Sequence, residues 1–390
     1  MSQISKSQPV LYVEPRIWLF RFLIDNWQRP GTVLAFLTRC VWYQKVNDRL
    51  YIKAQWNLIP GSRSSSVVAQ FNHYFLNRWN VLLTARLLGF RKVRPVSSRS
   101  GNEKVVPAPQ SSASEVVWIY DTEAAEYLDA FPRAIVVYDC VDDHAAQAGP
   151  DRNPERVEAE EQRILKRADL VTVTSQALLK AKRRQAKVIH LVTNAGDVEL
   201  FATRSTSAWP FSWPQGNPVL GSVGALDSYK YDFKMIADVA QRRPGWQFVF
   251  VGAPVVEQKG KQLAELKKLG NVHILGTVPR QKVPGLVAHF DVCLIPYREN
   301  RYNAASFPLK FWEFMATGKP IVVSGLPELK AYQDVIGLIT SADQFIRETE
   351  KWLRSPELSS SKRSQLAQNH SWAKRTERLL LLLSQTINHR

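Results

Sequence analysis

The sequence predicts an α/β protein with two Rossmann-like, doubly wound domains that face each other across a cleft. Short apolar runs alternate with charged helical patterns along most of the chain, which is typical of parallel sheets wrapped by helices. The 390 residues are enough for two domains, each with its own core. Residues 203–218 are rich in Ser, Trp and Pro and follow neither a helical nor a strand period, so we interpret them as the linker.

The first domain is predicted over residues 1–202. Its strand candidates are short runs of β-branched and aromatic residues, which are suited to a sheet that is covered on both faces. The predicted strands are 10–13, 116–120, 134–138, 170–174 and 188–192. The helical patterns are 16–28, 33–43, 67–89, 122–129, 154–167 and 176–184, and residues 91–109 form a polar, basic surface loop.

The second domain is predicted over residues 219–358 and repeats the alternation. It begins with a strand at 219–223, which is followed by a helix at 233–242. Residues 359–390 are predicted to form a final helical segment, helical from 359 to 387. The further strands of the second domain are 246–251, 272–275, 291–296, 321–323 and 335–339.

Composition indicates a soluble globular protein, with 45% hydrophobic and 22% charged residues. The three cysteines have neither disulfide nor zinc spacing, which favours a reducing compartment. We find no secretory signal and no apolar run of about 20 residues that could span a bilayer, so we expect a cytoplasmic protein. The formal net charge of +17 implies an anionic partner: nucleic acid, an acidic membrane surface or a phosphorylated substrate.

Basic residues mixed with Trp and Phe in residues 16–43 leave two interpretations open. The segment could lie as an interfacial helix on anionic lipid, peripheral to the inner face of the cell membrane. Alternatively, it is an ordinary helix that packs on the core and keeps its arginines in solvent.

The stretch 303–324 predicts a phosphate-binding helix. Pro308 fits the start of a helix, Gly318 fits its end, and the apolar run 321–323 fits a buried strand. Lys310 and Glu313 stand three residues apart and therefore share one face near the helix start. Backbone N–H groups and a lysine there would bind phosphate, and a carboxylate one turn on could accept two sugar hydroxyls. The alternative is a surface ion pair of little consequence.

Three further loops follow strands of the second domain, where ligands bind in open α/β sheets. Gly224 would let the backbone approach a ligand closely, and Lys230 could reach a phosphate. Gly252 and the loop that contains Val278 could offer backbone groups to a nucleotide base. The alternative for each is an ordinary strand–helix turn.

An acidic cluster ends the strand 134–138 of the first domain. Asp139, Asp142 and Asp143 precede His144, and crowded carboxylates raise one another's pKa, which suits a general base. A metal site is formally possible, but the spacing repeats no metal motif. The alternative is that Asp142 or Asp143 caps the next helix.

These segments together resemble glycosyltransferases of the GT-B fold, most of all bacterial enzymes of surface-polysaccharide or teichuronic-acid assembly. A single segment is a weak signal, but their number and order are specific. The resemblance includes His370-Ser371-Trp372, which matches the final helix that crosses back to the first domain. The matching segments are residues 137–143, 167–171, 194–201, 245–252, 271–276, 291–297 and 308–323.

The resemblance implies a role for each candidate residue. Glu313 would hold the ribose of a nucleoside diphosphate sugar, and Lys310 with the backbone from Ser306 to Leu309 would hold the diphosphate. Asp142 matches the catalytic base of related inverting enzymes, with Asp139 and Asp143 beside it. In the second domain, Gly224 and Lys230 would line the phosphate path, and Gly252 and Val278 would lie near the base.

The resemblance also implies the partners. The first domain would bind the acceptor, a hydroxyl of a glycan or of a polyprenyl-diphosphate-linked glycan at an anionic membrane surface, and residues 219–358 would bind the donor. We expect no metal, no other cofactor and no nucleic-acid partner. A nucleotide-sugar epimerase on the same fold and an inactive sugar-nucleotide-binding homologue are the alternatives.

The chain departs from the family pattern at several positions. Ala305 stands where many retaining relatives carry a second glutamate, and an Arg–Lys pair is reduced to Ala225 and Lys230. These departures favour an inverting outcome. Residues 10–14 resemble the family's second strand, which implies that the first strand of the first domain is missing.

Overall fold

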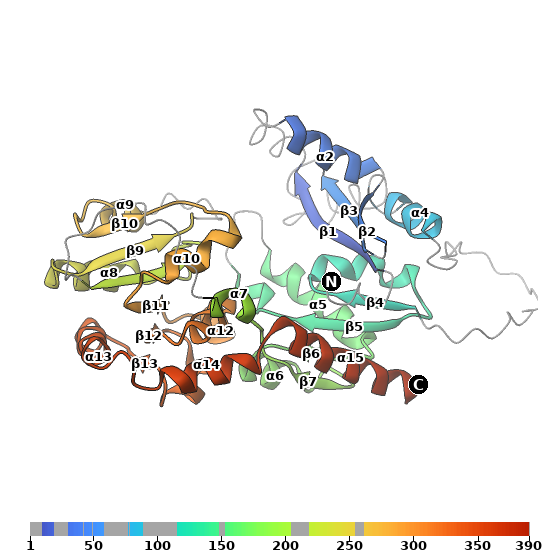
Figure 1. The fold of residues 1–390 in the computed structure, drawn as a ribbon. Helices are drawn as coiled ribbons and strands as arrows, with labels where there is room; N and C mark the ends of the chain where they lie inside the picture. The colour runs from blue at the N-terminus through green and yellow to red at the C-terminus, as the bar shows by residue number, and fades with distance from the viewer. Residues whose placement is uncertain are drawn as a thin grey trace, which may run out of the picture.

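The computed structural model describes residues 10–18, 30–41, 43–48, 50–57, 77, 79–88, 115–147, 153–203, 218–253 and 261–389. Two α/β domains lie side by side, and a small N-terminal unit sits against the first of them (Figure 1). Most of the predicted linker, residues 204–217, and the predicted loop 91–109 lie outside the described residues.

The second domain is built on a parallel six-stranded sheet with strand order β10-β9-β8-β11-β12-β13. In chain order within the domain this is 3-2-1-4-5-6, the arrangement of a dinucleotide-binding sheet. The order reverses between β8 and β11, and ligands bind at the carboxyl ends of strands beside such a point. The strands are β8 Val219–Val223, β9 Gln247–Val251, β10 Val272–Ile274, β11 Val292–Pro296, β12 Ile321–Ser324 and β13 Gly337–Leu338.

Helices enclose this sheet, so its central strands are almost entirely buried and form one large apolar core. Local signals explain the helix starts: Asp232 caps α8 and Ser341 caps α13 with side-chain hydrogen bonds to the first turn. The predicted helix 233–242 is confirmed with the same bounds. The elements are α8 Phe233–Arg242, α9 Lys261–Leu266, η5 Arg280–Lys282, α10 Val283–Val287, α11 Arg301–Ala304, α12 Leu309–Thr317, η6 Pro327–Tyr332 and α13 Ala342–Arg354.

The first domain has a parallel four-stranded sheet with strand order β4-β5-β6-β7. All four predicted strands from residue 116 onward are confirmed, and so is the helix 154–167. The predicted helix 122–129 is a 3-10 helix, η3, instead of an α-helix. The elements are β4 Val116–Ile119, η3 Thr122–Ala130, β5 Ile135–Cys140, η4 His144–Ala146, α5 Pro154–Arg167, β6 Leu170–Val173, α6 Gln176–Lys182, β7 Ile189–Leu191 and α7 Val198–Ala202.

The N-terminal unit differs most from the prediction. Strand β1, Val10–Trp18, continues through residues for which we predicted the start of a helix, and the rest of that helix, 19–28, lies outside the described residues. The strands β2, Gln44–Asn47, and β3, Leu50–Asn57, were not predicted. Strand β1 pairs in parallel with β3 in a separate sheet. Helices α2, Pro30–Val41, and α4, Trp79–Leu87, accompany this sheet (Figure 1).

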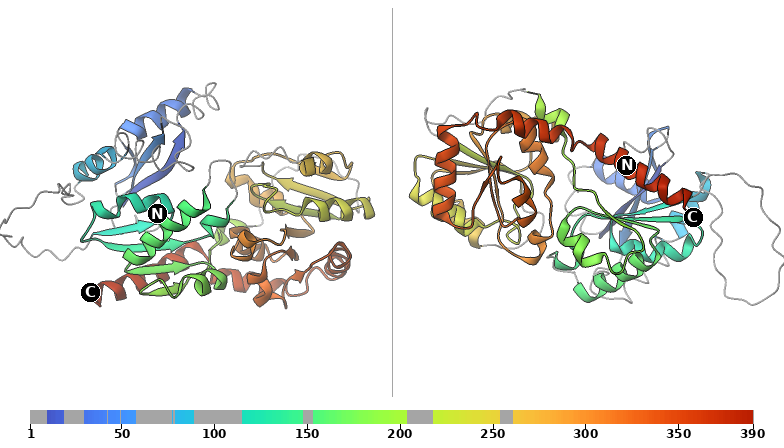
Figure 2. Two further views of the ribbon diagram at one scale, coloured as in Figure 1. Left: turned by 180° about the vertical axis from the view of Figure 1, so that it is seen from behind. Right: turned by 90° about the horizontal axis from the view of Figure 1, so that it is seen from below.

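The C-terminal segment crosses from the second domain back to the first, as predicted (Figure 2). It forms two helices, α14 Ser360–Gln368 and α15 Trp372–Asn388, where we predicted one continuous stretch. The break arises because Ser371 caps α15 by accepting a hydrogen bond from the Lys374 backbone N–H. Leu379 and Leu382 of α15 then pack on the first sheet. Among the described helices, none has the length and apolar character needed to cross a membrane.

Candidate active site

The first turn of α12 has the properties of an anion-binding site. Pro308 occupies the N-cap position in extended conformation and has no side chain that could cap the turn. The first N–H groups of the helix, where the helix dipole is positive, therefore keep their capacity to bind an anion. At the other end Gly318 adopts the left-handed conformation with φ 72°, which ends the helix as predicted.

Lys310 brings a positive charge to this turn. Its ammonium donates a hydrogen bond of 2.7 Å to the Tyr231 hydroxyl and lies 5.0 Å and 5.3 Å from the ring centroids of Tyr231 and Tyr297. Burial alone would lower the pKa of Lys310, but the two phenol groups outweigh it and raise the pKa, so the side chain is charged at neutral pH. Within the described residues Lys310 forms no ion pair with a carboxylate.

Gly224 lies next to the Lys310 ammonium. The backbone there has φ 124°, and a Cβ at this position would lie 3.1 Å from Lys310 Nζ. Gly252 packs against it so closely, with φ 142°, that a Cβ would lie 1.9 Å from the Gly224 carbonyl oxygen. Both loops therefore require glycine, and they bring backbone to the reversal point of the sheet next to Lys310.

Glu313, one turn further along α12, is held by a residue that the sequence did not indicate. The Arg280 guanidinium forms a bidentate ion pair with the Glu313 carboxylate, with N–O distances of 2.5 Å and 3.3 Å. Arg280 also contacts the end of the first domain. Its Nη2 lies 3.8 Å from Asp197 Oδ2, and its Cζ lies 5.1 Å from the ring centroid of Phe201. Glu313 is thus fixed in position, because a planar guanidinium sets the orientation of a carboxylate.

Asp142 of the first domain meets the loop before α12 of the second. The Ser306 hydroxyl donates a hydrogen bond of 3.2 Å to Asp142 Oδ1, and the Tyr302 hydroxyl bonds to the same carboxylate. Burial raises the pKa of Asp142 above its usual value, and the nearby His144, these hydrogen bonds and the charge of Lys230 offset only part of the shift. Asp142 of the acidic cluster therefore contacts the loop just before α12, the helix for which the sequence predicts phosphate binding.

Asp143 makes different contacts from those of Asp142. Its carboxylate accepts a hydrogen bond from the Ala146 backbone N–H, which caps the 3-10 helix η4. It also accepts a hydrogen bond of 2.7 Å from Arg301 Nε in the second domain. Asp143 therefore caps the next helix, which is the alternative we had kept, and it also joins the two domains.

Asp139 is fully buried. Arg375 of α15 donates to both of its carboxylate oxygens, at 2.8 Å and 3.0 Å, and the Thr172 hydroxyl donates to one of them. A carboxylate enclosed in this way is out of reach of an acceptor hydroxyl. Asp139 holds the C-terminal helix on the first domain, and we give it no part in catalysis.

This ion pair allows a stability prediction. Replacing Arg375 with methionine leaves the Asp139 carboxylate buried without its counter-charge, so we expect a loss of about 3–5 kcal/mol of stability. Urea unfolding followed by tryptophan fluorescence measures the change. The matched control is Lys374→Met on the exposed face of the same helix, for which we expect a change within about 0.5 kcal/mol. An equal effect of both substitutions would contradict the structural role of Asp139.

The remaining predicted residues lie at the same edge of the second domain. Lys230 is half-buried, 5.3 Å and 5.5 Å from the ring centroids of Tyr229 and Tyr302. Leu309 is exposed at the start of α12, and Val278 is half-buried two residues before Arg280. Among the described residues no group of three or more His, Cys, Asp or Glu side chains could hold a metal ion.

The tyrosines around the two lysines were missed in the sequence. Tyr231 and Tyr297 come from two separate loops and Tyr302 comes from α11, and the three side chains lie around Lys310 and Lys230. Their only signal was position, because Tyr231 follows Lys230 directly and Tyr297 directly follows the predicted strand 291–296. Aromatic residues in such places are more often part of the core, and Tyr231 and Tyr297 are indeed buried.

The loop from Asn194 to Gly196 completes the junction between the domains. Asn194 Nδ2 donates a hydrogen bond of 2.7 Å to the Phe307 carbonyl oxygen just before α12. The Gly196 N–H donates a hydrogen bond to the His370 carbonyl oxygen. The His370 ring stacks on the Trp312 ring, with the ring centroids 3.6 Å apart. The start of α12 is therefore positioned by the first domain and by the C-terminal crossover.

Two facing Rossmann-like domains with a C-terminal helix that crosses back constitute the GT-B fold, as the sequence predicted. Solved structures confirm this fold. Sucrose-phosphate synthase from Thermosynechococcus elongatus matches with a TM-score of 0.67 and 15% identity, covering 89% of this chain and 86% of that chain. Anabaena HepE, in complex with UDP and glucose, matches with a TM-score of 0.59 and 15% identity, covering 97% of this chain and 99% of that chain. At such identities the likeness shows the fold alone.

Sequence comparison identifies the class more closely. Residues 217–355 match the family described as Glycosyl transferases group 1. A Bacillus subtilis (strain 168) protein with the provisional name teichuronic acid biosynthesis glycosyltransferase TuaH is 35% identical over 210 residues, which are 51% of this chain and 52% of that protein. The chain thus spans about half the length of the curated relative it matches. Both findings confirm the predicted resemblance to glycosyltransferases, and the Bacillus relative confirms the resemblance to bacterial enzymes of surface-polysaccharide assembly.

Proposed function

We propose that this protein is a glycosyltransferase that moves a sugar from a nucleoside diphosphate donor to a hydroxyl of a glycan or lipid-linked acceptor in surface-polysaccharide synthesis. One observation carries the proposal. The Lys310 ammonium is charged, forms no ion pair among the described residues and points at the backbone of Gly224, beside the uncapped first turn of α12. A diphosphate at this place would supply the missing negative charge.

The donor would lie along the carboxyl edge of the second sheet. The diphosphate would bind between Gly224 and the first turn of α12, the ribose would bind to Glu313, and the base would lie near Gly252 and Val278. Uridine is the nucleoside we favour, because HepE, which shares the fold, was solved with UDP and glucose. A single donor site at the reversal point of a sheet is also the general rule for this architecture.

The reaction would be a direct displacement at the anomeric carbon. Asp142 would take the proton of the acceptor hydroxyl, whose oxygen forms a bond to the anomeric carbon. The bond from that carbon to the diphosphate oxygen breaks, and the leaving nucleoside diphosphate keeps the electron pair. Lys310 and the helix N-terminus would stabilise its charge, so no step calls for a metal ion. A single displacement inverts the configuration of the sugar, which agrees with Ala305 in place of a second glutamate.

The N-terminal unit supports an acceptor held at a membrane. Trp79, Leu83 and Leu87 lie on one face of α4 and are 62%, 56% and 61% exposed, and Leu34 of α2 is 68% exposed. Exposed apolar residues on a chain of net charge +17 suit the anionic inner face of a cell membrane. Co-sedimentation with phosphatidylglycerol vesicles tests this contact, and recovery of the protein in the supernatant at low salt would exclude it.

Thermal-shift screening with nucleoside diphosphates tests the proposed function most simply. A ligand that binds only the folded chain raises its melting temperature by mass action. We expect UDP and UDP-sugars to raise it, and uridine to have little effect, because the diphosphate makes the main contacts. If no nucleoside diphosphate or nucleotide sugar shifts the melting temperature at millimolar concentration, the proposal fails.

Arg280 provides a specific prediction about the ribose. If it orients Glu313 toward the ribose hydroxyls, Arg280→Ala should abolish the preference of the wild type for UDP over 2′-deoxyuridine diphosphate. We expect a preference of about tenfold in the wild type, since a hydrogen bond to a charged group contributes about 1.5–3 kcal/mol. Arg280→Lys should keep only part of it, because an ammonium cannot bind a carboxylate bidentately. Isothermal titration with both nucleotides measures the ratio, and an unchanged ratio in Arg280→Ala would refute this role.

A further inference from the structure

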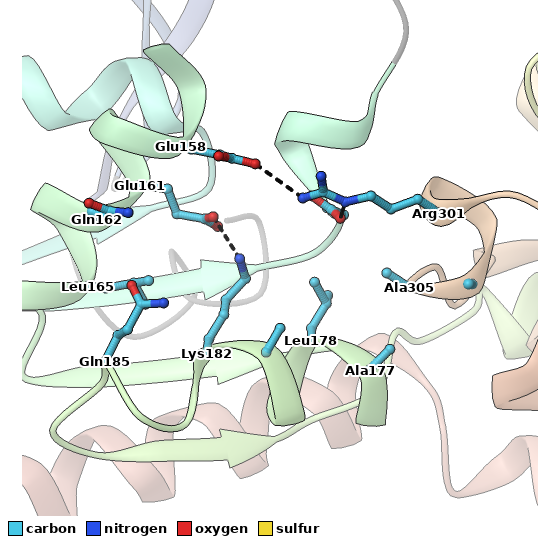
Figure 3. A pocket seen from close by; sticks show the side chains of 13 residues that line it. Glu158, Glu161, Gln162, Leu165, Ala177, Leu178, Lys182, Gln185, Arg301 and Ala305 are labelled. Carbon is cyan, nitrogen blue, oxygen red and sulfur yellow. Dashed lines mark hydrogen bonds and ion pairs between the residues drawn. The ribbon is translucent and has the colours of Figure 1, made fainter. Parts of the chain in front are cut away.

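A groove of about 400 Å³ lies outside the proposed donor site, between helices α5 and α6 of the first domain (Figure 3). The second domain closes one end of it with Arg301 and Ala305, which come from α11 and the residue after it. The groove therefore extends across the junction of the two domains. None of its lining residues belongs to the donor-binding set described above.

A buried ion pair lies at the bottom of the groove. Lys182 and Glu161 are 2.7 Å apart, and their side chains are 8% and 9% exposed. Glu161 also accepts a hydrogen bond of 2.7 Å from the Tyr138 hydroxyl, so its acceptor capacity is largely used. The Lys182 ammonium has three N–H donors, and Glu161 is its one acceptor within the described part of the chain. Two donors of a side chain that is more than nine-tenths buried are thus left for an occupant of the groove.

The charged side chains of the lining pair with one another. Lys182 pairs with Glu161, and Arg301 pairs with Asp143 and with Glu158 at 3.3 Å. These three carboxylates outnumber the two cations, so the groove offers no excess positive charge to a phosphate. An occupant should therefore carry no negative charge, and it should be rich in hydrogen-bonding groups.

The other lining residues fit the same chemistry. The amide side chains of Gln162 and Gln185 both donate and accept hydrogen bonds, as hydroxyl groups do. Leu165 and Leu178 give the groove an apolar wall. Donors, acceptors and an apolar face around a space of this size match a hexose ring, which has hydroxyls at its edge and C–H groups on its faces.

The groove ends beside the proposed catalytic base. Asp143 and Ala305 line it, and their chain neighbours Asp142 and Ser306 form the 3.2 Å contact between the domains. We propose that the groove binds a hexose unit of the acceptor glycan, next to the unit that receives the new sugar. This inference rests on the proposed function, and it makes the acceptor a glycan of at least two sugars.

Saturation-transfer NMR with methyl glycosides tests the inference on the full chain with UDP present. The probes are the uncharged methyl β-glucopyranoside and methyl β-N-acetylglucosaminide, with inorganic phosphate as the charged competitor. We expect saturation transfer to at least one glycoside. Ala181→Trp fills the groove from an exposed position and should weaken this binding about tenfold or more, which corresponds to 1.4 kcal/mol.

Lys180→Trp is the matched control, because Lys180 is exposed on the same helix but does not line the groove, and it should bind the glycoside like the wild type. Three results would overturn the inference: no glycoside binds, binding survives Ala181→Trp, or phosphate displaces the glycoside. UDP titration of the same samples separates the two claims. Failure to bind UDP refutes the donor site, whereas the response of glycoside binding to Ala181→Trp decides the groove.

Discussion

Replacing Lys310 with methionine is expected to weaken UDP binding about 10- to 100-fold. The substitution removes the charged group that we propose as a hydrogen-bond donor to the diphosphate, and a bond of this kind contributes about 1.5–3 kcal/mol. Methionine keeps the length and apolar stem of the side chain, so the packing against Tyr231 and Tyr297 should survive. Uridine should bind both proteins equally, because it has no phosphate for Lys310 to contact. Isothermal titration with UDP and with uridine measures the dissociation constant of each ligand for both proteins.

Lys234→Met provides the matched control. Lys234 is exposed on α8, and its substitution removes the same unit of charge away from Gly224 and α12. UDP affinity should remain within about twofold of wild type, since exposed charges are screened by salt. A Lys310→Met protein that binds UDP as tightly as this control would show that the diphosphate lies elsewhere.

Replacing Asp142 with asparagine is expected to reduce sugar transfer about 10²- to 10⁴-fold, the usual contribution of a general base. Asparagine can still accept the hydrogen bond from Ser306, so the contact between the domains and the affinity for UDP should be preserved. UDP release from UDP-sugars, with a bacterial envelope lipid extract as the source of acceptor, measures the loss. Asp129→Asn is the control, because Asp129 lies on η3 of the same domain, is 73% exposed and does not line the groove. It should keep transfer within about twofold of the wild type, since its ion pair with Arg163 is exposed and contributes little.

The pH profile of the wild type provides a second measurement on Asp142. A general base acts only when it is deprotonated, and burial raises the pKa of Asp142 above its usual 3.8. The rate should therefore fall as the pH is lowered through this raised pKa, at a pH where an exposed aspartate would still be ionised. The residual activity of Asp142→Asn should lack this acid limb. The same limb in both proteins would assign the titration to another group.

Much of the fold could be predicted because its signals are local. Helices α5 and α8 begin at side-chain caps and repeat apolar residues at helical spacing, and both were predicted with their observed bounds. The central strands are buried on both faces and therefore form short, continuous apolar runs. The N-terminal strands β2 and β3 lack such runs: Lys45, Lys53 and Gln55 interrupt them, and no strand was predicted there.

The candidate site could be predicted only in part, because its partners come from distant parts of the chain. Asp139 looked catalytic in the sequence, but its counter-charge Arg375 lies 236 residues away on a helix that crosses between domains. Arg280 lies shortly after a predicted strand, but no pattern in the sequence indicated that it would pair with Glu313, which lies 33 residues later. Residue types and strand positions were enough to predict which edge of the sheet holds the site. Which charged side chains pair with each other could be seen only in the tertiary structure.

A crystal structure of the protein with bound UDP tests the central claim most directly. The account predicts the diphosphate between Gly224 and the first turn of α12, within hydrogen-bonding distance of Lys310 Nζ. It also predicts the ribose hydroxyls on the Glu313 carboxylate, with Arg280 still beside it. UDP bound in any other place, or a diphosphate that does not contact Lys310, would contradict the assignment of this edge as the donor site.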